Sequence, residues 1–178
     1  MDSGRIALFC GVETREKMHG IRLSELLRSG AIVPSLKGTK VEEVAAELVD
    51  ALIEAEALPH VHRESAIISI LKRENSSSTG LGAGVALPHA KVPFVRDFVA
   101  ALGLASEGVD FNSSDSAPVK AVFLLFSPKE DPYGHLWLLG TIAGLIRQPR
   151  FVDSLIRSVD REQVRERIAD AEDRLNGA

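Results

Sequence analysis

The sequence predicts an α/β protein: a single domain with a central mixed β-sheet flanked by helices on both faces. Apolar runs of strand length lie at residues 84–88, 98–105 and 119–126, and continuous runs of this kind are typical of strands buried on both faces. Apolar residues at helical spacing recur before and after these runs, so helices are available to cover the sheet. A chain of 178 residues is long enough for one good core and short for two domains.

The elements before the sheet are expected to be helical. Residues 1–20 carry little amphipathic pattern and are interpreted as an N-terminal extension, which leaves 21–178 as the domain. A short helix that begins near Leu23 is expected to end at Gly30, because glycine commonly follows a helix.

Two longer helices should follow. Residues 42–56 have apolar residues at helical spacing, and Thr39 and Glu42 have the spacing of a capping box at the start of that helix. The next helix is expected to close with Lys72 and Arg73 in its last turn, where the helix dipole favours positive charge.

The elements after the polar loop at 75–80 include the predicted strands and further helices. A turn at 115–118 is expected before the last strand. Asp131-Pro132 should open a helix at about 133–148, and Pro149 should end it. Helices at 150–157 and 161–175 are expected to complete the chain.

Composition excludes several classes of function. The net charge of −4 provides no basic footprint, so nucleic acid is not an expected partner. The single cysteine, Cys10, rules out an internal disulfide framework and agrees with a reducing compartment. No stretch has the length of a membrane span, and the start of the chain lacks the long apolar region of a signal peptide. We therefore expect a cytoplasmic protein without direct membrane insertion.

The glycine-rich segment at 80–84 matches neither common phosphate motif. It lacks the GK[ST] end of a P-loop, and it precedes a strand where the dinucleotide fingerprint would follow one. Turn glycines with positive φ are the simpler interpretation, and the backbone N–H groups of such turns can also form an anion-binding nest.

His89 is the strongest candidate for chemistry. Val85-Ala86-Leu87 has the pattern of a buried strand, and Pro88 interrupts its hydrogen bonding. His89 is then expected at the carboxyl end of a strand, where open α/β sheets bind ligands. An imidazole in that place can serve as a nucleophile, an acid or base, or a metal ligand.

The other histidines carry weaker signals. His60 and His62 form an H-x-H pair, but no third ligand is near in sequence, so we expect a polar turn and no metal site. His135 lies in the first turn of the predicted 133–148 helix, where the dipole and the free N–H groups favour an anion.

Several blocks in the right order resemble a known family. Leu81-Gly82, two further residues and then Val85-Ala86-Leu87-Pro88-His89-Ala90, with Glu74 upstream, resemble the signature of the type 2 IIA domains of the bacterial phosphotransferase system. Arg73-Glu74 before Ser78-Thr79-Gly80 and the later block His135-Leu136-Trp137-Leu138-Leu139 are also similar. The resemblance covers about residues 22–175. It departs at Gly134, where an acidic or amide residue is frequent, and at the bulky Trp137.

The resemblance implies a phosphohistidine carrier that needs no metal and no cofactor. His89 would take a phosphoryl group through Nε2 from HPr or its nitrogen-branch equivalent, and would pass it to a IIB domain. Arg73 would clamp the phosphoryl oxygens, His135 would donate a hydrogen bond to them, and Thr79 and Gly80 would add further donors.

Alternatives remain open at this level. Because the chain shows no fused membrane or IIB domain, it is expected to be either a separate sugar-branch component or a nitrogen-type regulatory IIA protein that signals by its phosphorylation state. A metal-dependent hydrolase using His89, His135 and Asp131 is a remote alternative, since no H-E-x-x-H or comparable cluster is present. A binding module with a structural His89 is a third class.

Overall fold

A mixed six-stranded sheet organises the residues that the computed structural model describes, which are 21–27, 31–111 and 117–177. The strand order is β1-β5-β6-β3-β2, and β4 also pairs with β6. The strands in chain order are β1 (Ile32–Val33), β2 (Gly80–Gly82), β3 (Val85–Ala86), β4 (His89–Val92), β5 (Val99–Val109) and β6 (Val119–Pro128). The expected N-terminal extension, the helix end at Gly30 and the start of the turn at 115–118 lie outside the described residues.

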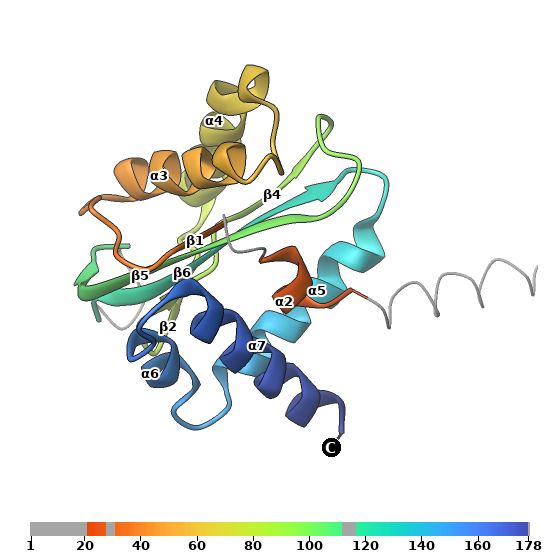
Figure 1. The fold of residues 1–178 in the computed structure, drawn as a ribbon. Helices are drawn as coiled ribbons and strands as arrows, with labels where there is room; N and C mark the ends of the chain where they lie inside the picture. Colours follow the sequence, from red (N-terminus) through yellow and green to blue (C-terminus); the bar gives the residue numbers. More distant parts are fainter. Residues whose placement is uncertain (1–20, 28–30, 112–116, 178) are drawn as a thin grey trace, which may run out of the picture.

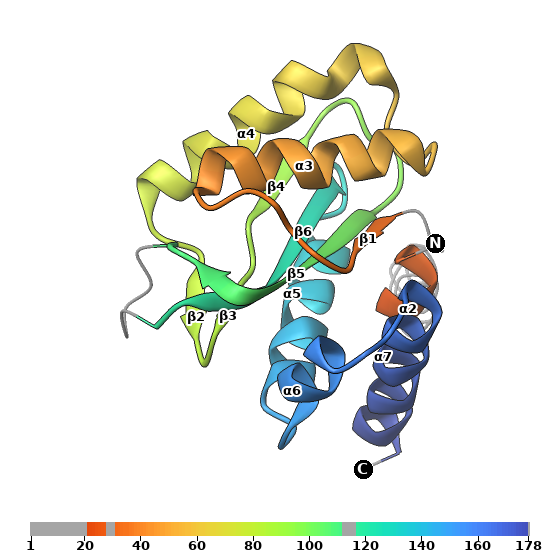
Figure 2. The same cartoon turned by 60° about the vertical axis from the view of Figure 1, so that its left-hand side comes forward.

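Helices cover both faces of the sheet (Figures 1 and 2). They are α2 (Leu23–Leu26), α3 (Val41–Glu54), the 3₁₀ turn η2 (His60–His62), α4 (Arg63–Ser76), α5 (Pro132–Ile146), α6 (Phe151–Ile156) and α7 (Arg161–Asn176). α3 and α4 lie on one face, and α2, α5, α6 and α7 lie on the other. The predicted fold class, a single α/β domain with a central mixed sheet, is confirmed. Within the described residues, no helix is long and apolar enough to cross a membrane.

Alternation along β6 explains the two-sided core. Val122, Leu124 and Phe126 pack into the cluster under α3 and α4. Phe123 and Leu125 pack into the cluster under α5, α6 and α7. Since successive side chains of a strand point to opposite faces, one apolar run supplies both cores.

The apolar run that ends in His89 forms two short strands in a single register. β3 pairs in parallel with β6 through Ala86 and Val122, and β4 continues the same register through His89 and Leu125. The N–H of Leu125 donates to the Pro88 carbonyl oxygen at 3.0 Å. Pro88 therefore keeps one hydrogen bond to β6 although it has no N–H of its own. His89 therefore begins a new strand, and the expectation that it follows the end of the sheet pairing is corrected. β6 offers backbone partners beyond the proline, which the sequence pattern of 89–92 does not reveal.

The glycine-rich segment forms the β2–β3 hairpin. Gly82 has φ 77° and Gly84 has φ 74°, the left-handed conformation expected of turn glycines. The turn lies beside Ala121 of β6, whereas His89 lies beside Leu125. That separation along β6 is about 13 Å. This turn is therefore remote from His89.

Two helix starts show how these helices are capped. α5 begins at Pro132, close to the predicted start, and the Asp131 carboxylate caps it by accepting from the Gly134 N–H at 2.8 Å. The capping box of Thr39 with Glu42 is wrong, because α3 begins at Val41 and its third position is Glu43. The Glu43 carboxylate accepts from the Thr39 N–H at 2.8 Å. α4 ends at Ser76, and Arg73 lies in its last turn, as predicted.

Candidate functional site

The His89 ring is oriented by its own backbone. The imidazole is half-buried, and Nδ1 lies 2.8 Å from the carbonyl oxygen of Leu87. A carbonyl only accepts, so Nδ1 carries the proton and donates, and in the neutral ring Nε2 keeps its lone pair. Burial is the main cause that lowers the pKa of His89 from its usual 6.5. The ring is therefore mainly neutral at pH 7, with Nε2 as its nucleophilic nitrogen.

The His135 ring is oriented by a side chain. It lies in the first turn of α5, is 6% exposed, and its Nδ1 is 2.8 Å from the hydroxyl oxygen of Ser127. Burial, followed by the neighbouring charges of His89, Lys91 and Arg73, lowers the pKa of His135 to about 4. His135 is therefore neutral under physiological conditions. When the Ser127 hydroxyl donates to Nδ1, the Nε2 of His135 carries the proton and becomes a donor.

The two imidazoles lie close together. Their ring centroids are 5.5 Å apart and the planes are tilted by 52°. The predicted closeness of these rings is confirmed. They come together because His89 starts β4 while His135 starts the helix that follows β6, the strand paired with β4. Two neutral imidazoles, one of them with its lone pair on Nε2, thus lie side by side.

Two cations, Arg73 and Lys91, act electrostatically on both the His89 and the His135 ring. Arg73 in α4 is half-buried, donates through Nη1 to the Ser77 carbonyl at 2.9 Å, and helps to lower the pKa of both His89 and His135. Lys91 in β4 acts on both rings in the same direction. Arg73 therefore acts electrostatically on both rings, while its observed hydrogen bond is to its own helix end. The predicted contact of its guanidinium with a group on His89 stays a prediction.

The segment after α4 is held by a carboxylate. Glu74 accepts from the N–H of Thr79 at 3.0 Å and also from its hydroxyl. The N–H of Gly80 donates to the Ser78 hydroxyl oxygen at 3.2 Å. The donors predicted to bind phosphate at Thr79 and Gly80 are thus already engaged within the loop. Their phosphate-binding role stays a prediction, and it requires these bonds to open.

Two residues of the site were not found from the sequence. Ser127 is one of several small polar residues near strand ends, and nothing in its spacing connects it to His135 eight residues later. Lys91 reads as an ordinary exposed charge. The alternating pattern of β4 would have put Lys91 on the face of His89, had the strand itself been predicted.

His60 and His62 lie in a turn, as the sequence predicts. They form the turn η2, and the His62 ring stacks on Phe94 with centroids 4.8 Å apart. Over the described ranges, histidine, cysteine and acidic side chains nowhere gather in threes that could hold a metal ion. Asp131, the carboxylate of the hydrolase alternative, is used as the α5 cap.

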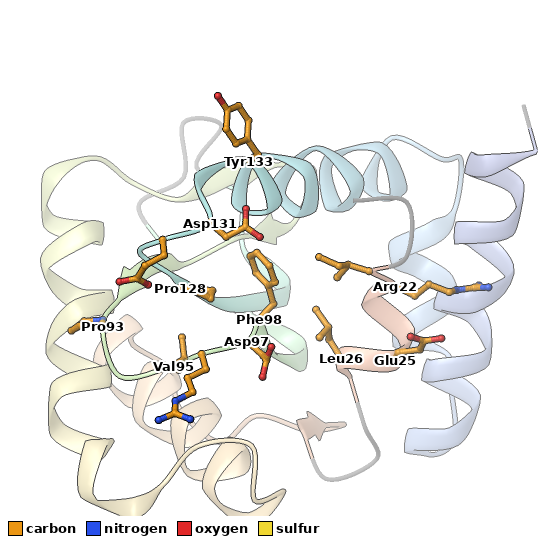
Figure 3. Close-up of a pocket in the computed structure, with 13 residues that line it drawn as sticks. Arg22, Glu25, Leu26, Pro93, Val95, Asp97, Phe98, Pro128, Asp131 and Tyr133 are labelled. Carbon is orange, nitrogen blue, oxygen red and sulfur yellow. The ribbon is translucent and has the colours of Figure 1, made fainter. Parts of the chain in front are cut away.

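A cavity of about 960 Å³ lies beside the start of α5 (Figure 3). It opens between α2, the loop after β4 and the segment from Pro128 to Tyr133. Figure 3 shows the Phe98 ring reaching toward Asp131. A Cβ on Gly134 would meet the Phe98 ring at 2.5 Å and the Asp131 carboxylate at 2.6 Å, so a larger side chain fits here only if these groups shift. Neither histidine lines this cavity.

Fold and site together define the class: an α/β protein with paired imidazoles at the edge of a mixed sheet. Comparison with known proteins then identifies the family. Residues 25–171 match the family described as phosphoenolpyruvate-dependent sugar phosphotransferase system, EIIA 2. The chain therefore belongs to the EIIA type 2 family of the phosphotransferase system.

Similar proteins fall into a sugar branch and a nitrogen branch. The fructose-specific EIIABC component of Bacillus subtilis is 31% identical over 85% of this chain, which spans only 22% of that longer protein. The nitrogen regulatory protein of Bradyrhizobium diazoefficiens is 30% identical over 80% of this chain and 91% of its own length. The crystal structure of the nitrogen regulatory protein IIA-Ntr from Neisseria meningitidis superposes with a TM-score of 0.75 at 28% identity, covering 82% of this chain and 98% of that one.

Proposed function

We propose that this protein is a phosphohistidine carrier in which His89 accepts a phosphoryl group and passes it on. The 5.5 Å approach of the His89 and His135 rings carries this proposal. The family supplies the class of reaction, and the orientation of each ring by Leu87 or Ser127 supplies the chemistry. We also propose that the protein acts in the cytoplasm, where its phosphocarrier partners would be found.

The proposed step uses the ring nitrogens in distinct roles. The Nε2 lone pair of His89 attacks the phosphorus of a donor phosphohistidine, and the donor imidazole leaves with the electron pair of its N–P bond. The proton stays on Nδ1, which keeps donating to the Leu87 carbonyl oxygen, so His89 needs no general base. Phosphoryl transfer depends on in-line positioning and charge stabilisation more than on covalent machinery, and exchange between imidazoles needs no metal or nucleotide.

The remaining residues would stabilise the phosphoryl oxygens. His135 would donate from Nε2 while Ser127 holds its Nδ1. Arg73 would turn its guanidinium from the Ser77 carbonyl toward the phosphoryl group, for which a planar fork is well shaped. Glu74 would keep the adjoining loop in place through Thr79.

The partners we propose are an HPr-type phosphocarrier as donor and a IIB domain as acceptor. Regulation is the second candidate, with the phosphorylation state of His89 read by a target protein. The similarity to nitrogen regulatory proteins supports it, with 30% identity to the protein of Bradyrhizobium diazoefficiens and 28% identity to that of Neisseria meningitidis.

Labelling of the purified chain tests the carrier function. Incubation with phosphoenolpyruvate, enzyme I and either HPr or its nitrogen-branch equivalent should add the mass of one phosphoryl group, in a linkage labile to acid and stable to base. His89→Gln should stay folded and take no label, while the matched control His60→Gln, altered at an exposed turn, should label normally. Undiminished labelling of His89→Gln would overturn the assignment. Faster labelling by the nitrogen-branch donor than by HPr would favour the regulatory role.

A further inference from the structure

Strand register places Lys91 on the same side of the sheet as the histidine pair. His89 pairs with Leu125, and Lys91 pairs with Ser127. Paired residues of neighbouring strands point to one face, as do residues two apart in a strand. Leu125 packs into the core under α5, and Ser127 bonds to His135. His89 and Lys91 therefore leave β4 toward the side that α5 covers.

The intervening residues of β4 confirm this assignment independently. Ala90 and Val92 both pack into the opposite cluster, under α3 and α4. The strand therefore alternates without a bulge from His89 to Val92, and the side of Lys91 follows directly from that alternation.

Lys91 has both the reach and the freedom to meet a group carried on His89. Two residues of a strand are about 7 Å apart, and a lysine ammonium sits on a flexible stem of four carbons. Lys91 is exposed, in contrast to the fully buried Ser127 with which it pairs. Its charge is felt at both imidazoles, since it lowers the pKa of His89 and of His135.

A phosphoryl group on His89 needs positive charge nearby to stabilise it. A phosphoryl group brings close to two negative charges near neutral pH. Burial and the surrounding cations lower the pKa of His135 to about 4, so before transfer its ring offers a hydrogen bond and no charge. The charged groups that act on the His89 ring are Arg73, Lys91 and Glu74. Glu74 would repel the phosphoryl group, so the charges of Arg73 and Lys91 must balance the charge of that group.

We propose that Lys91 binds the phosphoryl group on His89 through its ammonium, as a point charge that complements the fork of Arg73. This proposal rests on the proposed carrier function and adds a specific residue to it. As the new N–P bond forms on Nε2 of His89 and the donor's N–P bond breaks, Lys91 follows the oxygens and keeps its own proton. Lysine suits this role because its donors rotate with a group that arrives and leaves.

Transfer kinetics and ³¹P NMR on the full chain test this contact. Lys91→Met should slow phosphoryl transfer to His89 roughly 10–100-fold, the scale of one charge-assisted hydrogen bond. It should also raise the pKa at which the phosphoryl ³¹P signal titrates, because a cation near a phosphoryl group favours its dianion. Lys91→Arg should bring both the transfer rate and the ³¹P titration pKa most of the way back to the wild-type values. The matched control Lys120→Met changes an exposed lysine of β6, about 16 Å along the strand from Leu125, and should change neither.

The outcomes separate this contact from the carrier function itself. If the wild type labels, His89→Gln does not, and Lys91→Met matches the wild type in rate and ³¹P titration, the Lys91 contact is wrong while the carrier function stands. A slower rate that recovers in high salt, with an unchanged ³¹P titration, would also overturn it, since long-range steering explains that result. Absence of label on the wild type with every donor would overturn the carrier function and the Lys91 contact with it.

Discussion

The two histidines of the site are the same residue type held in opposite ways. The His89 ring is half-buried and bonds to a backbone carbonyl, which no substitution at Leu87 removes. The His135 ring is buried and bonds to the hydroxyl of Ser127, which a single substitution can delete. The first arrangement fixes a lone pair on Nε2 and suits a nucleophile. The second, with the Ser127 hydroxyl donating to Nδ1, places the proton on Nε2 and suits a hydrogen-bond donor.

Among substitutions around His89, we expect those at Arg73 to slow phosphoryl transfer most. Arg73→Ala should slow transfer roughly 10–1000-fold, the scale seen when one charge-stabilising donor is removed. Arg73→Lys should recover only part, because lysine cannot form a bidentate fork. Rapid-quench measurement of phosphoryl transfer gives both rates. If Arg73→Ala transfers like the wild type, the guanidinium only closes the end of α4 through the Ser77 carbonyl.

Removing the His135 ring should separate its role from that of His89. His135→Ala should still accept phosphate on His89 but pass it on roughly 100-fold more slowly, since the donor that steadies the departing phosphoryl group is lost. Intact mass measures acceptance, and loss of label to an acceptor domain measures onward transfer. Equal loss of both steps would contradict distinct roles for the rings, and a label on His135 in His89→Gln would do so as well.

The pKa of His135 makes stability depend on pH in a defined window. The folded pKa of about 4 lies below the usual 6.5, so between these values the unfolded chain binds more protons than the folded one. Stability supported by the neutral ring is complete above pH 6.5 and is lost as the pH falls toward 4. The loss amounts to up to about 3 kcal/mol.

Urea unfolding of the wild type and His135→Gln at pH 7 and at pH 4.5 measures this loss. Carboxylates titrate in both proteins, so the difference between their pH dependences isolates the ring. The wild type should lose more free energy of unfolding over this interval than the variant. Identical losses would show that His135 is not held neutral by the fold.

The smallest effect is expected at the hydroxyl that orients His135. Ser127→Ala removes the partner of Nδ1, so the ring can exchange its protonated nitrogen, and transfer should slow by roughly 2–10-fold, as for one neutral hydrogen bond. ¹⁵N NMR of the imidazole should show a single tautomer in the wild type and a mixture in the variant. If Ser127→Ala keeps the same single tautomer of His135, a group other than Ser127 sets that tautomer.

The long, periodic elements were predictable because their signals are local. The predicted helix at 42–56 appears as α3, and the helix predicted at 133–148 appears as α5 with its aspartate cap. Buried apolar runs likewise located β5 and β6. The strand β4 was missed because His-Ala-Lys-Val alone has no strong strand pattern, and it forms only because β6 offers an unbroken parallel edge beyond Pro88.

By itself, the sequence determined the fold class, the family resemblance and the identity of His89, Arg73 and His135 as candidates, because these depend on periodicity and on motifs short in sequence. Tertiary structure alone decided how they meet. The 5.5 Å between the rings, the Ser127 bond and the side of the sheet taken by Lys91 all follow from pairing β4 with β6 and packing α5 on their common face. Such contacts join residues whose distance in the chain carries no information about their distance in space, so only the register of the folded sheet can specify them.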